Sequence, residues 1–291
     1  MANIVKINGK DIKDVVARNE VADLKSAIEQ IEPGLSDDAK VALLDCLNHM
    51  EWVEGDGSAY IRALKTALNM SDRDPDLPDA YDQVTYIEST GTQYIQTNLL
   101  TRIPMRVVAS MVISGTAQPT VVGGGVSSVP NSRFFLVATP YDSRANHIGN
   151  RFANDTVSWT EDGNTHTSGW LDIRSFVASN TEKYDIESGI EYASSSGKVR
   201  TYIECNGYSV EGERNTPTVG YPICFFYQSN ADVVVAGTLY SCKIYTSNSL
   251  IFNAVPCVRK SDNTPGVYDT ISGEFYTNAG TGTFEVGEIV E

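Results

Sequence analysis

The feature that most constrains the fold is a change in hydrophobic period near residue 80. Beyond it, the chain consists of short runs rich in β-branched and aromatic residues, bounded by glycine, asparagine and aspartate. Such runs predict β-strands. The predicted strands are 84–88, 93–98, 106–113, 133–138, 199–205, 223–227, 237–245, 250–258, 266–269 and 274–277. No long helical pattern separates them, so we expect residues 81–291 to form an antiparallel β-sandwich or jelly roll and not a parallel α/β sheet.

Residues 1–35 have a helical period instead, with a helix predicted over 10–35. Val21, Leu24, Ile28 and Ile31 follow one another at spacings of three and four, as heptad core positions do. A short coiled coil and an ordinary amphipathic helix both fit this pattern. Isoleucine at both core positions favours a trimer if the coil forms. We therefore expect this module to attach and oligomerise the protein, as a homo-oligomer and most naturally a trimer.

Two further segments lie between this helix and the sandwich. Residues 36–71 predict a helical hairpin, in which Ser36 caps the first helix and Ser58 caps the second. Residues 72–80 contain Pro75, Pro78 and several aspartates, which favour extended, solvated chain. We expect a linker there.

Composition limits the classes of partner. The formal net charge of −15 repels phosphate backbones and anionic bilayers, so nucleic-acid and membrane-surface binding are not expected. No apolar run approaches the roughly 18 residues needed to span a bilayer. The amino terminus is polar from the start, which predicts no signal peptide and synthesis in a cytosol. The five cysteines include no CxxC pair, so we expect buried thiols and neither zinc nor redox chemistry.

Both ends of the predicted sandwich resemble a known family. The stretch Tyr-Ile-Glu-Ser-Thr-Gly-Thr-Gln-Tyr-Ile at 86–95 looks like the first strand pair of a concanavalin A-like, or laminin-G-like, sandwich. The stretches 239–245, 252–257, Gly-Val-Tyr-Asp at 266–269 and Gly-Glu-Phe-Tyr-Thr-Asn at 273–278 resemble the end of the same domain. This form of the domain occurs in phage, prophage and gut-bacterial surface proteins. The stretches 7–18 and 39–46 are similar to modules of phage tail or head appendages. The resemblance implies a virion appendage, of tail-fibre or head-fibre type, with a carbohydrate-binding sandwich.

Catalytic and metal motifs are largely absent. Retaining glycosidases of this fold place carboxylates on one strand as E-x-D-x-x-E, whereas 182–187 has the wrong spacing and Glu204 lacks a partner two residues away. Asp142, Asn146, Asn150 and Asp155 could supply oxygen ligands to calcium, but aspartate and asparagine are also ordinary turn residues. We expect no cofactor, no metal and no catalytic residue.

A ligand site is expected in the stretch between residues 141 and 170, which we predict to form long loops. Sugar sites combine aromatic rings with hydrogen-bonding amides and arginines, and this stretch concentrates both. The predicted ligand-binding residues, with His166 nearby, are Tyr141, Arg144, Asn146, Asn150, Arg151, Trp159 and Trp170. The alternative for the two tryptophans is a place in the core.

These features together predict a noncatalytic virion appendage protein. Its amino-terminal part would bind other virion structural proteins, and its sandwich would bind a host-cell glycan or another receptor. Two alternatives remain open: a purely structural capsid or tail decoration protein, and a glycan hydrolase on the same fold.

Overall fold

A computed structural model describes residues 6–7, 10–11, 73–113, 120–125, 133–138, 147–153, 156–179, 181–194, 197–228 and 233–290. The chain divides into two compact units, Met1–Asp72 and Arg73–Glu291. In the first unit, β1 (Lys6–Ile7) pairs antiparallel with β2 (Lys10–Asp11), so the expected helix does not begin at residue 10. The rest of that helix, with Val21, Leu24, Ile28 and Ile31, and the predicted hairpin 36–71 lie outside the described residues.

The second unit is built on a 13-stranded antiparallel sheet. Ten strands follow one another across it: β11 (Asn164–Ser168), β10 (Val157–Glu161), β15 (Tyr208–Asn215), β14 (Lys198–Cys205), β13 (Tyr184–Tyr192), β6 (Met105–Ile113), β19 (Ala236–Thr246), β20 (Ser249–Arg259), β21 (Thr264–Asp269) and β22 (Glu274–Thr277). Three short strands complete it: β3 (Tyr81–Gln83) pairs with β20, while β4 (Ile87–Thr90) pairs with β19 and with β23 (Glu285–Val286).

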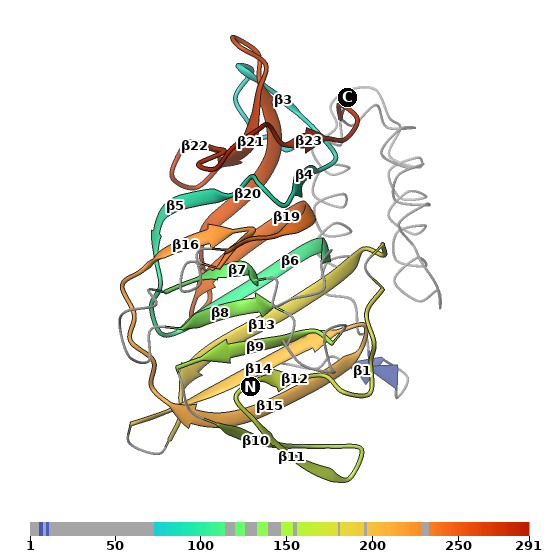
Figure 1. Cartoon of the computed structure of the whole chain (residues 1–291), viewed down its shortest axis with the longest axis vertical. Helices are drawn as coiled ribbons and strands as arrows, with labels where there is room; N and C mark the ends of the chain where they lie inside the picture. The colour runs from blue at the N-terminus through green and yellow to red at the C-terminus, as the bar shows by residue number, and fades with distance from the viewer. Residues whose placement is uncertain are drawn as a thin grey trace, which may run out of the picture. The chain divides into compact units, whose positions relative to one another are not determined.

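A second antiparallel sheet of six strands packs against the first. Its order is β12 (Leu171–Asp172), β9 (Gly149–Phe152), β8 (Phe134–Ala138), β7 (Thr120–Gly124), β16 (Pro222–Phe225) and β5 (Ile95–Leu100). A small pair, β17 (Tyr227–Gln228) and β18 (Val233–Val234), forms a two-stranded sheet of its own. In Figure 1 the six-stranded sheet lies in front of the larger one, so the architecture is a two-layer sandwich. Mainly antiparallel β structure is therefore confirmed, and the described residues contain no helix.

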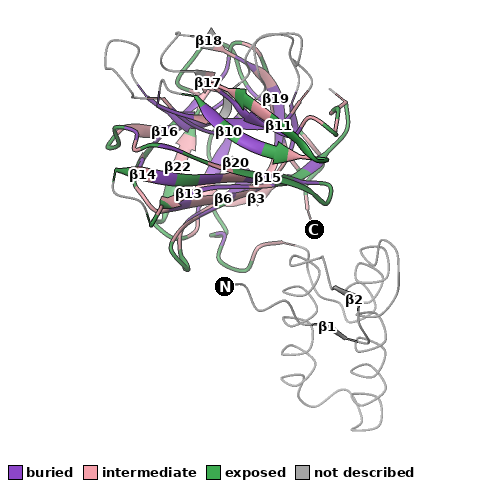
Figure 2. Cartoon of the chain, turned by 90° about the horizontal axis from the view of Figure 1, so that it is seen from below, coloured by how far each residue is buried: buried purple, intermediate pink, exposed green. Residues whose placement is uncertain are grey.

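The core lies between the two layers, where buried residues concentrate in Figure 2. Strand β14 shows why these residues form strands: Val199, Ile203 and Cys205 point inward, while Arg200 and Glu204 between them are exposed. This period of two buries one face of the strand and leaves the other in water. Eight of the ten predicted strands are confirmed, with ends that shift by a few residues. The predicted strand 84–88 overlaps β4 only at residues 87 and 88, and the predicted strand 223–227 is broken at Phe226 between β16 and β17.

The prediction of long loops between residues 141 and 170 is partly wrong. This stretch contains β9 and the hairpin of β10 and β11. The hairpin is rich in threonine and serine, and its turn at Asp162 and Gly163 has positive φ at both residues. Its polar outer residues and sparse apolar ones concealed the alternation that identifies a strand.

The two stretches that carry the family resemblance form structural contacts with each other. The amide of Tyr94 donates to Asn278 Oδ1 over 3.1 Å, and the amide of Ala279 donates to the Tyr94 carbonyl oxygen over 2.8 Å. Asp269 is buried and accepts hydrogen bonds from the amides of Asn253 and Ser272, at 2.8 and 3.2 Å. These motif residues therefore join the beginning of the sandwich to its end.

Residues 73–80, expected as a linker, instead pack on the sandwich. Leu77 is only 2% exposed and contacts Val255 and Cys257 of β20. The side chain of Gln83 accepts a hydrogen bond from the amide of Asp74 over 2.5 Å. The boundary between the two units accordingly falls at residue 72. No helix able to cross a membrane occurs in the part of the chain that the structure describes.

The cysteines of the sandwich match their prediction. Cys205, Cys224, Cys242 and Cys257 are free and buried in strands. Burial raises the pKa of Cys224 to about 12, and burial also raises the pKa of Cys205 to about 12 with help from nearby carboxylates. These thiols are therefore core residues and not nucleophiles.

Candidate functional site

The residues predicted to bind a ligand do not form one site. Tyr141, Arg144 and Asn146 lie outside the described residues. Asn150 is fully buried between the sheets, where its Nδ2 donates to Ser188 Oγ over 3.1 Å and to the Tyr202 carbonyl oxygen over 2.8 Å. Its predicted role in ligand contact is therefore wrong, because an asparagine in the core cannot reach a surface ligand. Its burial in the core also excludes Asn150 as one of the oxygen ligands considered for calcium.

Trp159 belongs to the core, as the alternative prediction had it. It is 3% exposed, and its ring lies 5.4 Å from that of His166 on the neighbouring strand. The Arg174 guanidinium sits 4.8 Å from the centre of the Trp159 ring, and its Nη1 donates to His166 Nδ1 over 3.0 Å. Asp172, also buried, lies 3.5 Å from Arg174 Nε. The charged groups around Trp159 thus bind one another and leave no open platform for a sugar.

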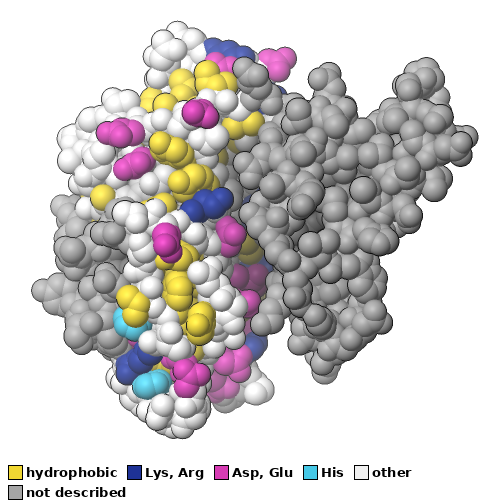
Figure 3. Space-filling view, turned by 90° about the vertical axis from the view of Figure 1, so that its right-hand side faces the viewer, with side chains coloured by type: hydrophobic (Ala, Val, Ile, Leu, Met, Phe, Trp, Pro, Cys, Tyr) yellow, Lys and Arg dark blue, Asp and Glu magenta, His cyan; other side chains and the backbone are white. Residues whose placement is uncertain are grey.

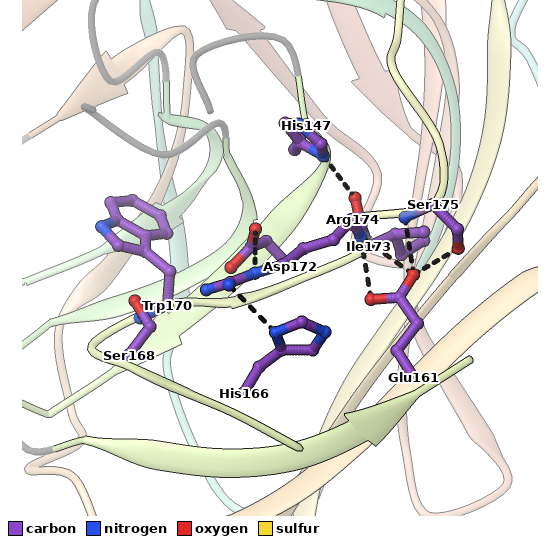
Figure 4. Close-up of polar contacts among 9 residues, drawn as sticks. All are labelled: His147, Glu161, His166, Ser168, Trp170, Asp172, Ile173, Arg174 and Ser175. Carbon is purple, nitrogen blue, oxygen red and sulfur yellow. Dashed lines mark hydrogen bonds and ion pairs between the residues drawn. The ribbon is translucent and has the colours of Figure 1, made fainter. Parts of the chain in front are cut away.

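Figure 4 shows how this cluster attaches the segment after β12 to the β10–β11 hairpin. The Glu161 carboxylate accepts the amides of Arg174 and Ser175 at 2.9 and 2.8 Å, and also the Ser175 hydroxyl. Burial acts to raise the pKa of Glu161, but these hydrogen bonds outweigh it and hold that pKa below its usual value. His147 donates from Nδ1 to the Ile173 carbonyl oxygen over 2.7 Å in the same region. The cluster is structural.

Arg151 and Trp170 do come together, on the side of the six-stranded sheet that faces away from the core. The Arg151 guanidinium lies 5.3 Å from the centre of the Trp170 ring, which stacks in turn on Phe135 at 6.2 Å. Trp170 is only 5% exposed, so it supports Arg151 and offers no ring face of its own.

An open hollow on the outer face of the large sheet is the best candidate for a ligand site. Its volume is about 490 Å³, within the range of about 300–1,000 Å³ that small-ligand sites occupy. The lining residues come from β10, β14 and β15: Thr160, Arg200, Tyr202, Glu204, Ser209, Val210 and Glu211. The hollow therefore combines an aromatic ring with charged and hydroxyl groups.

Tyr202 is placed in the hollow by Gly189, its partner on β13. A Cβ at position 189 would lie 2.5 Å from Tyr202 Cε1, so only glycine lets the ring lie across the neighbouring strand. The Tyr202 hydroxyl donates to Glu187 Oε1 over 3.2 Å, and Arg106 Nη1 donates to Glu187 Oε2 over 3.2 Å. Burial and the charge of Glu187 raise the pKa of Tyr202, which keeps its hydroxyl protonated.

Some charged groups of the hollow have ion-pair partners among the described residues, and others do not. Arg200 forms ion pairs with Glu191 and Glu211, which raise its pKa. Glu204 has no hydrogen-bond or ion-pair partner among the residues that the structure describes. An unpaired carboxylate beside an aromatic ring is free to accept hydrogen bonds from a ligand.

Sequence reasoning missed the carboxylate that faces Glu204 on the neighbouring strand. Glu187 and Glu204 are direct Cα partners across β13 and β14, with both side chains on the outer face of the sheet. The glycosidase motif places its carboxylates on one strand, whereas this hairpin brings together residues 17 positions apart, counted from their numbers. The Ser-Gly pair at 196–197 was the available signal in the sequence, because such a pair is typical of turns and the centre of a hairpin fixes which residues face each other.

In the described ranges, no three histidine, cysteine, aspartate or glutamate side chains converge to hold an ion.

Comparisons with known proteins do not assign the chain to a family. No protein-family model matches the chain, and no curated protein does. One similar solved structure is the heptameric SAP-like pentraxin from Limulus polyphemus, with a TM-score of 0.37, 8% identity, and coverage of 74% of this chain and 98% of that one. Another is SCP-B, a peptidase of the Eqolisin family in complex with the tripeptide Ala-Ile-His, with a TM-score of 0.25, 13% identity, and coverage of 67% and 100%. At such low TM-scores, no property of either protein carries over to this chain.

Proposed function

We propose that this chain is a noncatalytic recognition protein of a virion appendage, whose sandwich binds a host-surface glycan in the Tyr202 hollow. The observation that carries the proposal is a partly buried tyrosine ring in an open hollow of about 490 Å³, flanked by Arg200 and Glu204. Sugars bind through apolar contact of a ring face with an aromatic side chain and through hydrogen bonds from their hydroxyls to charged groups. The hollow offers both.

The assembly part of the proposal rests on the sequence. The heptad-like spacing of Val21, Leu24, Ile28 and Ile31 supports a trimer, and the resemblance of the amino-terminal stretches supports attachment to other virion proteins. Three copies would multiply a weak glycan site into useful avidity. The protein would be made in the bacterial cytoplasm and carried on the virion.

An exposed hydrophobic band is a second surface suited to protein contact. Figure 3 shows hydrophobic side chains following one another down one edge of the sandwich. Across the described chain as a whole, the exposed large hydrophobic residues include Val177, Tyr208, Val286 and Ile289. Such a surface is typical of proteins that assemble with others, and it also fits the alternative of a purely structural decoration protein.

A glycan array followed by isothermal titration of the full chain tests the glycan proposal. We expect at least one host polysaccharide or oligosaccharide to bind, and Tyr202→Ala to weaken it by about tenfold or more, since loss of an aromatic contact costs about 1–3 kcal/mol. Tyr192→Ala is the matched control, because Tyr192 is an exposed tyrosine on β13 outside the hollow lining. Absence of any glycan binding would favour the decoration protein.

The Glu187–Glu204 pair favours one second candidate, a glycan hydrolase. Directly opposed residues of an antiparallel pair have Cβ atoms about 4.5–5.5 Å apart, and retaining glycosidases hold two carboxyl groups about 5–5.5 Å apart. Glu187, fixed by Tyr202 and Arg106, would be the nucleophile, and Glu204 the acid. Release of reducing ends by the wild type, lost in both Glu187→Gln and Glu204→Gln, would establish hydrolysis in place of simple binding.

A further inference from the structure

The outward side of the six-stranded sheet carries a small cluster separate from the main core. Phe134 and Phe152 point into the core, so their neighbours Phe135 and Arg151, which are Cα partners, point the other way. Phe135 and Trp170 form their own buried pair there. Arg151 lies over Trp170, so an arginine covers this aromatic pair.

Two arginines meet at this place. The amide of Ala153 donates to the carbonyl oxygen of Arg133 over 2.9 Å. Arg133 therefore faces Ala153 across the sheet and lies diagonal to Arg151 on the same side. The Nε of Arg151 is buried and lacks a hydrogen-bond partner. Burial, and then the charge of Arg133, lower the pKa of Arg151 to about 10.

Neither arginine has a carboxylate partner among the described residues, which is unusual in a chain with a net charge of −15. Several other arginines of the sandwich are paired with carboxylates: Arg106 with Glu187, Arg174 with Asp172 and Arg259 with Asp262. Keeping two like charges close together and partly buried costs free energy unless an anion compensates them. The uncompensated pair is the signature of a site that binds its anion from solution.

We propose that Arg133, Arg151 and Trp170 form an anion-binding site, which takes a carboxylate or phosphate group of a ligand. The planar guanidinium of Arg151 has its orientation fixed by the Trp170 ring below it and by Gly169, where a Cβ would lie 3.3 Å from Arg151 Nη2. A fixed guanidinium can bind both oxygens of such a group. Arg133 adds a second positive charge. The site lies on the opposite sheet from the Tyr202 hollow and does not depend on it.

Anion titrations of the full chain at constant ionic strength test this site. The probes are inorganic phosphate and glucuronate, with glucose as the neutral control, and the readouts are the thermal midpoint and tryptophan fluorescence. We expect phosphate, glucuronate or both to raise the midpoint and change the tryptophan fluorescence, to which Trp170 contributes, while glucose does neither. Binding of glucuronate alone would identify a sugar acid as the ligand class, and binding of phosphate alone would identify a phosphate group.

Three variants make the test specific. Arg151→Met keeps the packing on Trp170, and both it and Arg133→Gln should weaken anion affinity by about tenfold or more, because hydrogen bonds to charged groups are strong. Arg102→Gln removes an exposed arginine elsewhere and should bind as the wild type does. The proposal is overturned if neither anion binds the wild type, or if Arg151→Met and Arg133→Gln both bind with unchanged affinity.

Discussion

The side chain of Asn150 on β9 donates a hydrogen bond to the backbone carbonyl oxygen of Tyr202 on β14, over 2.8 Å. The two residues belong to different sheets, so this bond ties the strand that carries the hollow's tyrosine to the opposite layer. Asn150 also donates to Ser188 Oγ on β13. A residue expected to contact a ligand thus positions the strand beneath the candidate site.

Asn150→Leu should therefore destabilise the protein by about 1–3 kcal/mol, because it removes two buried hydrogen bonds and leaves the Ser188 hydroxyl, 3.2 Å away, as the remaining side-chain donor to the Tyr202 carbonyl. Urea unfolding of the full chain, followed by far-UV circular dichroism, measures this change. Asn164→Leu is the control, since Asn164 lies exposed on β11 and should change stability by less than about 0.5 kcal/mol. Equal effects of the two substitutions would refute the structural role of Asn150.

Gly189→Ala should impair ligand binding without unfolding the sandwich. The added Cβ would meet only the far end of the Tyr202 side chain, which can move away. The ring would then leave its place across β13, and its hydroxyl would lose Glu187. Titration with the glycan found for the wild type should show affinity reduced by about tenfold, with the loss of the aromatic contact. Tyr202→Phe, which retains the ring, should bind more tightly than Gly189→Ala; the opposite order would show that the ring is not the contact.

Glu161 should make the stability of the sandwich sensitive to acid. Its pKa is lowered in the folded state, so its contribution is complete above the unfolded value near 4.5 and is lost as the pH falls through the folded value. The thermal midpoint of Glu161→Gln should therefore lie below that of the wild type at pH 6, and the gap should close towards pH 3. Glu285→Gln, at an exposed position on β23, should show no gap at either pH. A gap for Glu161→Gln that persists unchanged at pH 3 would contradict the role of its ionised form.

The amino-terminal module should make the full chain trimeric. Light scattering gives the solution mass directly, and we expect three times the chain mass of 31.7 kDa. Because a charge inside the seam would separate the helices, Leu24→Asp combined with Ile28→Asp should reduce the mass to that of one chain. A monomeric wild type would contradict the coiled coil. An unchanged mass in the double variant would show that the subunits contact one another through another surface.

The strands were predictable where apolar and polar residues alternate clearly along the sequence. The candidate site was not predictable. The inward residues Val199 and Ile203 predict β14 and its faces, because period-two burial is a local property. The hollow depends on two cross-strand pairs, Tyr202 with Gly189 and Glu204 with Glu187. Both pairs are set by the register of the β13–β14 hairpin, which is not a local property of either strand. Asn150 misled the prediction because asparagine is common in loops and binding sites, whereas here its Nδ2 donates to Ser188 and Tyr202 of the opposite sheet in the core.

The most direct test of the glycan proposal measures retention and cleavage in one sample. Host-surface polysaccharide is immobilised, the full chain is passed over it, and both the bound protein and the released reducing ends are quantified. We predict that the wild type and Tyr192→Ala are retained, that Tyr202→Ala is not, and that no reducing ends appear. Retention of Tyr202→Ala at the wild-type level would contradict the proposed site, and release of reducing ends would contradict a noncatalytic protein.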